Sequence, residues 1–518
     1  MAKQSYLEWK RRKRKKELLE GEKYVESYSP PSFIGKVLMV FPGDYKVGMA
    51  NLGFQHVMRM WLKEGFEVDR LFLDDGLDQD ISFEKNFPIE SFDIISISFP
   101  FEGGAHRLLP FLKYLKKLPS RPLVVLGGST TYFNPYIFLD YVDYVIVGDG
   151  ENTISSLVTH ISSDSKLPPW IIRDVEDKPM VHKVLHIEEP AHSLIIPKDS
   201  VFENFFLIEI GRGCHVGCRF CVYGYTYRPI RHFSPDEIYN VIVRKQPKTT
   251  TVGLISASLS LHKQPEDVVE SVIDAGYRPV PSSLHVNEST TRLISLLAKV
   301  GNRSMTFAVE HGDKEFQKKL GKEVNPIHLN DLLRAGIENG LKNIKLYFIM
   351  GLGEDPEYNA ESGVRFLRTA LKGIRELKVS VSFSVLVPKP WTPFESLSFP
   401  SKSFVKREIK LWRRLISENR LPVNLILPSY KEAFEEYVIS RLSGDLVEKY
   451  IEGREDPKKL VNIANDKKVW KQLRQIDPTS LWNIEFQRFQ NGYQPIGCVG
   501  DCSACVVKSL KERGDTLA

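Results

Sequence analysis

Short apolar runs alternate with amphipathic stretches along the first third of the chain. Amphipathic segments such as Leu52–Leu62 and His106–Leu115 predict helices between buried strands. This alternation favours a doubly wound, Rossmann-like α/β domain over residues 34–180, with any ligand at the carboxyl ends of the strands. Glycines fall at those ends, at Gly103–Gly104, Gly127–Gly128 and Gly148–Gly150. The predicted strands are Val37–Phe41, Phe66–Phe72, Ile94–Phe99, Leu123–Leu126 and Tyr144–Val147.

A second series of strands and helices follows over residues 195–400. Right-handed crossovers between such strands give a parallel sheet that curls toward a barrel. We therefore predict a partial (β/α)6 barrel, with the helices Ile238–Arg244, Glu266–Ala275, Thr290–Lys299, Asn330–Asn339 and Tyr358–Leu371. Its strands are predicted at Phe205–Ile210, Thr251–Ala257, Val280–Val286, Ser304–Val309, Asn343–Ile349 and Val379–Val387.

The rhythm is lost over residues 401–518. Charged, mainly helical segments at Ser403–Asn419, Lys431–Leu442 and Pro457–Gln475 predict a helical C-terminal region.

The charge of the chain is local. The formal net charge is +6, and the seven consecutive cations of Lys10–Lys16 account for all of this excess. We interpret residues 1–33 as a basic N-terminal tail whose helix is solvated and frayed. Contact with RNA or another polyanion is the alternative. Met1–Glu20 lacks the apolar centre of a secretory signal, and no apolar run is long enough to span a bilayer. A cytoplasmic protein without a membrane partner is predicted.

All six cysteines fall in two triplets of identical spacing. Cys214, Cys218 and Cys221 form the first Cys-x3-Cys-x2-Cys motif, and Cys498, Cys502 and Cys505 form the second. Disulfides do not suit a cytosolic chain, and structural zinc takes four ligands, usually in separated pairs. Closely spaced triplets suit iron–sulfur clusters. Three thiolates on a four-iron cluster leave one iron without a protein ligand.

The surroundings of the first triplet indicate chemistry. The strand Phe205–Ile210 precedes it, and Ser234-Pro235 reads as the N-cap and first position of the next helix. The cysteines therefore lie on a loop that follows a barrel strand, at the end where active sites form.

Strand, Cys-x3-Cys-x-Phe-Cys loop and helix together resemble the radical SAM superfamily. The surrounding residues 211–238 resemble uncharacterised fused radical SAM proteins with a cobalamin-binding-like N-terminal domain. This resemblance implies that three thiolates hold a [4Fe–4S] cluster whose fourth iron binds S-adenosylmethionine. It also implies an electron donor of the flavodoxin or ferredoxin type. A cluster or zinc without a redox role is the alternative.

The resemblance also implies a set of cosubstrate contacts. Phe220 fills the aromatic position of the motif. Glu310 takes the place of the acidic residue that contacts the ribose, although it also reads as a surface residue at a strand end. Gly351 lies in the turn that flanks the adenine, or simply ends a strand. Ser256 and Ser258 stand where many relatives carry an acidic group for the amino group, and a hydroxyl is a weaker acceptor for a cation. No catalytic residue is assigned.

Two further cofactors follow less directly from the resemblance. The Asp-x-His-x-x-Gly loop of many cobalamin-binding domains is absent from Val47–Gly53, and His56 reads as an ordinary helical residue. We therefore favour a domain that has lost cobalamin or serves structurally. The second triplet predicts an auxiliary iron–sulfur cluster, with a structural cluster or zinc completed by a distant histidine as the alternative.

The functional hypothesis is a radical SAM enzyme that generates a 5′-deoxyadenosyl radical. The expected reaction is a modification of RNA or protein, such as methylation or methylthiolation. The alternative is a non-catalytic iron–sulfur protein that binds nucleic acid or a protein partner.

Overall fold

The structure is a computed structural model that describes residues 2–27, 33–177, 180–353, 355–466 and 488–490. No helix within these ranges combines the length and apolar character needed to cross a membrane. The helices are α1 (Ala2–Glu20), α2 (Tyr45–Ala50), α3 (Leu52–Lys63), α4 (Ala105–Leu115), α5 (Ser129–Phe133), α6 (Thr153–Ser163), α7 (Tyr223–Thr226), α8 (Pro235–Lys245), α9 (Pro265–Asp274), α10 (Thr291–Lys299), α11 (Lys314–Leu320), α12 (Pro326–Glu338), α13 (Pro356–Ala370), α14 (Lys402–Glu418), α15 (Tyr430–Ile439), α16 (Asp445–Ile451) and α17 (Pro457–Asp466).

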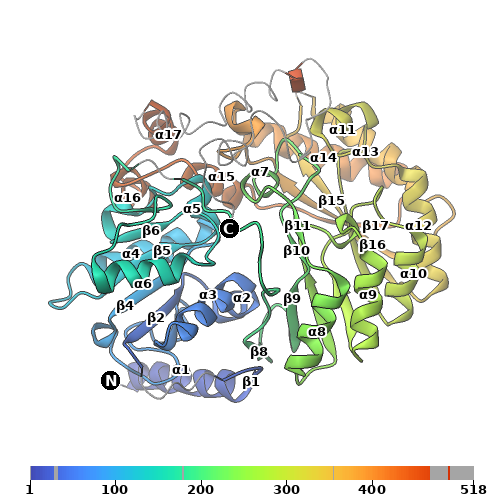
Figure 1. Ribbon diagram of the computed structural model, residues 1–518. Coiled ribbons are helices and arrows are strands. Elements are labelled where there is room, and N and C mark those ends of the chain that lie inside the picture. The colour runs from blue at the N-terminus through green and yellow to red at the C-terminus, as the bar shows by residue number, and fades with distance from the viewer. Residues whose placement is uncertain (1, 28–32, 178–179, 354, 467–487, 491–518) are drawn as a thin grey trace.

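A six-stranded sheet forms the N-terminal half. Its strand order is β3-β2-β4-β5-β6-β7, in which the first five strands run parallel and β7 runs antiparallel to β6. Separate hydrophobic cores cover its two faces, as a doubly wound sheet requires. The predicted doubly wound domain is confirmed (Figure 1). The strands are β2 (Lys36–Phe41), β3 (Glu67–Phe72), β4 (Ile94–Ser98), β5 (Leu123–Gly127), β6 (Tyr144–Ile146) and β7 (Ile171–Ile172).

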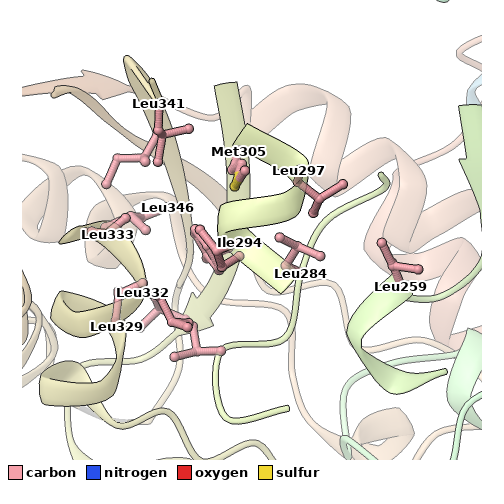
Figure 2. Close-up of a cluster of buried hydrophobic side chains, with 14 of the residues drawn as sticks. Leu259, Leu284, Ile294, Leu297, Met305, Leu329, Leu332, Leu333, Leu341 and Leu346 are labelled. Atoms are coloured by element: carbon pink, nitrogen blue, oxygen red, sulfur yellow. The ribbon is translucent and has the colours of Figure 1, made fainter. Parts of the chain in front are cut away.

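The second half is a parallel sheet whose strands follow one another in chain order. One segment is ordered β13-β12-β9 and the other β14-β15-β16-β17. A parallel bridge between Leu284 and Phe307 connects the two segments. The helices that flank this sheet enclose a large apolar core, part of which Figure 2 shows around Ile294, Leu297 and Leu346. The strands are β9 (Phe205–Glu209), β12 (Thr251–Ile255), β13 (Arg278–Pro281), β14 (Ser304–Glu310), β15 (Asn343–Met350), β16 (Lys378–Val385) and β17 (Val423–Ile426).

Two strands of this sheet differ from the sequence expectation. β13 ends at Pro281, so most of the predicted strand Val280–Val286 is a loop. Pro279 and Pro281 lack backbone N–H donors, which weakens any continued pairing. The region after residue 400 was predicted to have lost the strand–helix rhythm, yet α14 leads into β17, which pairs in parallel with β16. Alternate residues of β17 are exposed, so it does not read as a buried strand.

The basic N-terminal helix is docked rather than solvated, and the interpretation of a frayed helix is wrong. Arg14 donates two hydrogen bonds to the Asp74 carboxylate, at 3.0 and 2.9 Å. Lys15 is buried and donates to the Ser82 carbonyl at 3.0 Å. Leu18 is buried in the N-terminal core. After α1, β1 (Glu22–Tyr24) pairs with β8 (Ile195–Pro197), which fixes the end of the helix beside the second sheet.

Candidate functional site

The first cysteine triplet lies on the loop that leaves the carboxyl end of β9. β10 (Gly211–Arg212) pairs with β11 (Arg231–His232) and closes the base of this loop. Gly213 has φ +89°, and a Cβ there would meet the Tyr227 carbonyl oxygen at 2.5 Å. Only glycine suits this conformation and this close approach. The three cysteines, Cys214, Cys218 and Cys221, follow on the short segment above it, and all three are half-buried.

Tyrosines and a buried arginine brace the cysteine loop. The Tyr225 hydroxyl donates to the Gly217 carbonyl at 3.0 Å, and the Gly213 N–H donates to the Tyr223 hydroxyl at 3.1 Å. The fully buried Arg219 donates to the Lys319 carbonyl at the end of α11. The conformation of the loop is therefore set by its own sequence and by the last residues of α11.

The chemistry of the donors suits an iron–sulfur cluster. Burial raises the pKa of all three thiols. A metal must displace these protons, because thiolates and not thiols are the ligands. Within the described ranges no three His, Cys, Asp or Glu side chains converge as on a single metal ion. A four-iron cluster does not require such convergence, since each thiolate binds a different iron.

An ion pair stands beside the triplet. Lys322 Nζ lies 2.6 Å from Glu310 Oε1. Burial disfavours the Lys322 ammonium, but the Glu310 carboxylate and Cys218 outweigh burial and raise its pKa. Glu310 has φ +68°, a strained conformation of the kind that collects at functional sites. Glu310 is buried and is therefore not a plain surface residue. Its contact with the ribose stays a prediction.

The two serines expected at the amino group differ in their hydrogen bonding. The Ser258 hydroxyl lies 3.0 Å from Ser260 Oγ and accepts from the His285 N–H at 3.1 Å. The Ser256 hydroxyl is buried and has no hydrogen-bond partner among the described residues. Because an unpaired buried hydroxyl is costly, Ser256 is the better candidate for a ligand contact.

His285 was not singled out by the sequence. It lies in the loop after β13 and is 8% exposed, and neither ring nitrogen has a partner in the described part of the chain. Burial lowers its pKa to about 3, so the imidazole is neutral. The nearby Ser282 hydroxyl is also buried without a described partner. Nothing local in the sequence reveals this group, because the chain between Ser256 and His285 contains α9 and β13.

Phe220 and Gly351 lie at an apolar wall of the site. Phe220 packs against a cluster of Leu320, Leu352, Leu386 and Phe394. Gly351 has φ +84°, and its N–H donates to Glu408 Oε2 at 3.0 Å. Glu408 comes from α14, and burial raises its pKa to about 7. The turn that was expected near the adenine is thus held by a residue of the next helix.

A cavity of about 490 Å³ opens between the two halves. Small residues at the carboxyl ends of the N-terminal strands line one side, and Tyr223 and Tyr227 line the other. These N-terminal residues follow β2, β4, β5 and β6, around the point where the strand order reverses. Open α/β sheets bind ligands at such a point. The small lining residues include Ser96, Ser98, Gly127, Gly128, Ser129 and Gly148.

Charged groups join the two halves at the floor of this cavity. Arg212 donates to Glu209 and Glu151, each at 2.8 Å, and lies 3.2 Å from Asp149. Asp149 also accepts from Arg231 at 2.6 Å. Burial opposes ionisation of Asp149, yet Arg212 and its other cationic neighbours lower the pKa of Asp149 to about 2. The network joins the segment that follows β6 to β10.

Comparison with known families agrees with this geometry. Residues 208–362, which include the cysteine loop, match the Radical SAM superfamily. Residues 73–168 match the N-terminal region of radical SAM proteins. Residues 208–362 of the chain are a radical SAM domain. The resemblance seen in the sequence and the α/β fold class are both confirmed.

Relatives extend over most of the enzyme. It is 24% identical over 456 residues to an uncharacterized protein, MJ0966, of Methanocaldococcus jannaschii, a match that covers 87% of this chain and 98% of that protein. The radical SAM methyltransferase TsrM from Kitasatospora setae, solved with cobalamin and a [4Fe–4S] cluster, has a TM-score of 0.53 at 17% identity. That match covers 70% of this chain and 74% of TsrM. OxsB, a cobalamin-dependent radical enzyme solved with aqua-cobalamin and S-adenosylmethionine, has a TM-score of 0.51 at 14% identity. That match covers 92% of this chain and 83% of the OxsB chain.

Two predictions about this enzyme stay predictions: the auxiliary cluster at the second cysteine triplet, and the reading of His56 as an ordinary helical residue rather than a cobalt ligand. Cys498, Cys502 and Cys505 lie outside the described residues, so the auxiliary cluster is untested. His56 lines the cavity, but its Nε2 lies 3.2 Å from Glu151 Oε1 and is engaged there.

Proposed function

We propose that the enzyme cleaves S-adenosylmethionine reductively at a [4Fe–4S] cluster held by Cys214, Cys218 and Cys221. The resulting 5′-deoxyadenosyl radical serves a modification of RNA or protein, of the methylation or methylthiolation type. The observation that carries the proposal is the cavity that joins the switch point of the N-terminal sheet to the tyrosines after the cysteine loop. This arrangement supports two cofactor sites side by side.

Each group at the barrel edge has a part in this proposal. The cluster, when bound, supplies one electron and an iron to which the amino and carboxylate groups of the cosubstrate coordinate. Ser256 accepts a hydrogen bond from the ammonium, and Glu310 accepts from the ribose while Lys322 balances its charge. The apolar wall around Phe220 excludes water, which protects a radical from side reactions. A flavodoxin or ferredoxin type of protein supplies the electron.

The cavity suits cobalamin better than the sequence indicated. Glycines and serines at the strand ends leave an open volume with backbone and hydroxyl donors, which a large cofactor with amide arms requires. Cobalamin is bound in the structures of TsrM and OxsB. We propose that the small residues after β4 and β5 hold it here, and that His56 stays with Glu151 rather than binding cobalt.

The cleavage reaction is tested with anaerobically reconstituted protein, dithionite and S-adenosylmethionine. We expect 5′-deoxyadenosine or S-adenosylhomocysteine with the intact protein. Cys214→Ala should lose both the products and about four irons per chain. Cys502→Ala is the matched variant, because it removes one thiol from the second triplet and should keep the products. Absence of both products from a fully loaded protein would favour the alternative of a non-catalytic iron–sulfur protein.

Cobalamin binding is tested with Gly127→Val. A Cβ at Gly127 makes only ordinary contact, 3.7 Å from Ile146, so a strand-forming valine is tolerated while it narrows the cavity. Protein reconstituted with hydroxocobalamin should retain its visible absorption after gel filtration, and the variant should not. The iron content of the variant should stay unchanged. Equal retention by both proteins would place cobalamin elsewhere or nowhere.

A further inference from the structure

The outward side of α1 carries a dense group of cations. Lys10, Arg12, Lys13 and Lys16 are exposed, whereas Arg14 and Lys15 face the domain. Lys13 and Lys16 form long, solvent-exposed ion pairs with Glu17 and Glu20, at 3.8 and 3.7 Å. Such pairs contribute little and leave most of the charge available. The docking of the helix therefore fixes a positive face toward solvent.

Two aromatic rings extend this face. Tyr6 and Trp9 are 53% and 55% exposed, and their rings stack with centroids 6.1 Å apart and planes 18° apart. Lys10 lies 4.7 Å from the centre of the Tyr6 ring, and Lys13 lies 5.5 Å from that of Trp9. Exposed rings beside cations are the combination that binds single-stranded nucleic acid, because bases stack while the cations neutralise phosphates.

The end of α1 approaches the rim of the cavity. The Lys198 N–H donates to the Gly21 carbonyl at 2.9 Å, directly after the helix. In the same loop, the Val201 N–H donates to the Lys46 carbonyl at 3.3 Å, and Phe202 lines the cavity. Val201 is largely exposed. The loop 198–202 thus connects the end of α1 with the rim of the cavity proposed for cobalamin, and Figure 1 shows α1 ending beside β1 and β8.

We propose that the outward face of α1, formed by Tyr6, Trp9, Lys10, Arg12, Lys13 and Lys16, binds single-stranded RNA. This inference rests on the proposed function and names RNA as the substrate class. An anionic membrane is the competing partner for a basic helix. Insertion into a membrane needs an apolar face, but Leu18 and Leu19 of α1 pack against the protein instead. The free face consists of cations and stacked rings, which favours RNA.

The test uses the reconstituted full chain and a fluorescein-labelled, mixed-sequence RNA of 20 nucleotides. Fluorescence anisotropy gives the affinity over a range of KCl concentrations. The triple variant Lys10→Gln, Arg12→Gln, Lys13→Gln should bind about 100-fold more weakly at 0.1 M salt, and its log–log salt slope should be smaller by about 2. Trp9→Ala should bind about tenfold more weakly through lost stacking. Arg14 and Lys15 stay untouched because they anchor the helix.

Matched controls remove the same charge and a similar ring elsewhere. Lys402→Gln, Lys406→Gln, Lys410→Gln changes three exposed lysines of α14 and should leave affinity within about twofold. Tyr114→Ala removes an exposed ring of α4 and should have no effect. Equal losses in the α1 and α14 variants would overturn the inference. So would binding to vesicles that contain phosphatidylserine without binding to RNA.

Cleavage of S-adenosylmethionine is measured in the same samples without RNA. The α1 variants should cleave it at the rate of the unmodified protein, because α1 contributes nothing to the cysteine loop. Cleavage without RNA binding would sink the RNA inference and leave the proposed function standing. RNA binding by a fully loaded protein that does not cleave S-adenosylmethionine would instead contradict the proposed function and leave RNA binding by α1 standing.

Discussion

The two parallel sheets present opposite kinds of polar group at their carboxyl edges. At the edge of the N-terminal sheet, Asp149 is buried and Glu151 is half-buried, and Arg212 contacts both carboxylates. At the edge of the second sheet, Ser256, Ser282 and His285 have buried polar atoms without a partner among the described residues. Both edges resemble ligand sites in sequence, since each combines small and polar residues after strands.

The difference shows which polar groups find their hydrogen-bond or ion-pair partners within the protein. Buried polar atoms are nearly always hydrogen-bonded, so those left unpaired mark places where a ligand completes the bonding. At the N-terminal edge, the carboxylates of Asp149, Glu151 and Glu209 all have cationic partners in the protein, and these ion pairs join the two halves. At the second edge, polar atoms without a described partner are available to a ligand such as the proposed cosubstrate. Between them lies the cavity, where the charged groups Arg212, Asp149 and Glu151 are paired with one another.

The largest expected effect is on stability, from Arg212→Met. The change would leave three buried carboxylates short of a cation, which typically costs about 3–5 kcal/mol. Urea denaturation should show this loss in the free energy of unfolding. Arg292→Met is the control, because Arg292 is 65% exposed in its 2.7 Å pair with Glu270, so the urea midpoint of this variant should stay close to that of the unmodified protein. Similar losses in both variants would mean that the Arg212 network is not structural.

A second prediction uses the opposite pKa shifts of two buried carboxyls. Burial without a cation raises the pKa of Glu408 to about 7, above its unfolded value. The native state then binds more protons than the unfolded state between about pH 4.5 and 7, so stability falls as pH rises through this window. Glu408→Gln keeps an acceptor for Gly351 and removes this dependence. Between pH 5 and 8, the unmodified protein should lose roughly 2 kcal/mol relative to the variant.

Asp149→Asn provides the contrast for that measurement. The pKa of Asp149 is lowered to about 2, so its contribution to stability is complete above the unfolded pKa and is lost only in stronger acid. The difference between this variant and the unmodified protein should therefore stay constant from pH 5 to 8. Parallel pH curves for Glu408→Gln and the unmodified protein would contradict the assignment of Glu408.

The smallest predicted effects distinguish two neighbouring serines. Ser256→Ala removes a hydroxyl without a described protein partner, so folding stability should hold while affinity for S-adenosylmethionine falls about tenfold, or ~1.4 kcal/mol. Ser258→Ala breaks the bonds that fix His285 and should cost about 1–2 kcal/mol of stability. Equilibrium dialysis and urea denaturation measure the two quantities. The distinction fails if both variants lose affinity equally.

Much of the fold followed from sequence because its signals are local. β2, β14 and β15 lie within one residue of their predicted limits, since a continuous apolar run in β2 and mainly alternating apolar positions in β14 and β15 define them. β13 and β17 were misread for local reasons too. Prolines interrupt the former, and the exposed alternate residues of the latter hide it. The docking of α1 could not be foreseen, because its anchors Asp74 and Ser82 lie about 60 residues or more away.

The sequence by itself determined the chemistry of the triplet. Cys214, Cys218 and Cys221 lie within eight residues of one another, and spacing along a loop is a property of the chain alone. Tertiary structure decided what surrounds them. Lys322, Glu408 and His285 reach the site from separate elements, and their burial depends on every strand and helix packed around them. Only folding shows which polar atoms already have partners, and therefore which remain for a ligand.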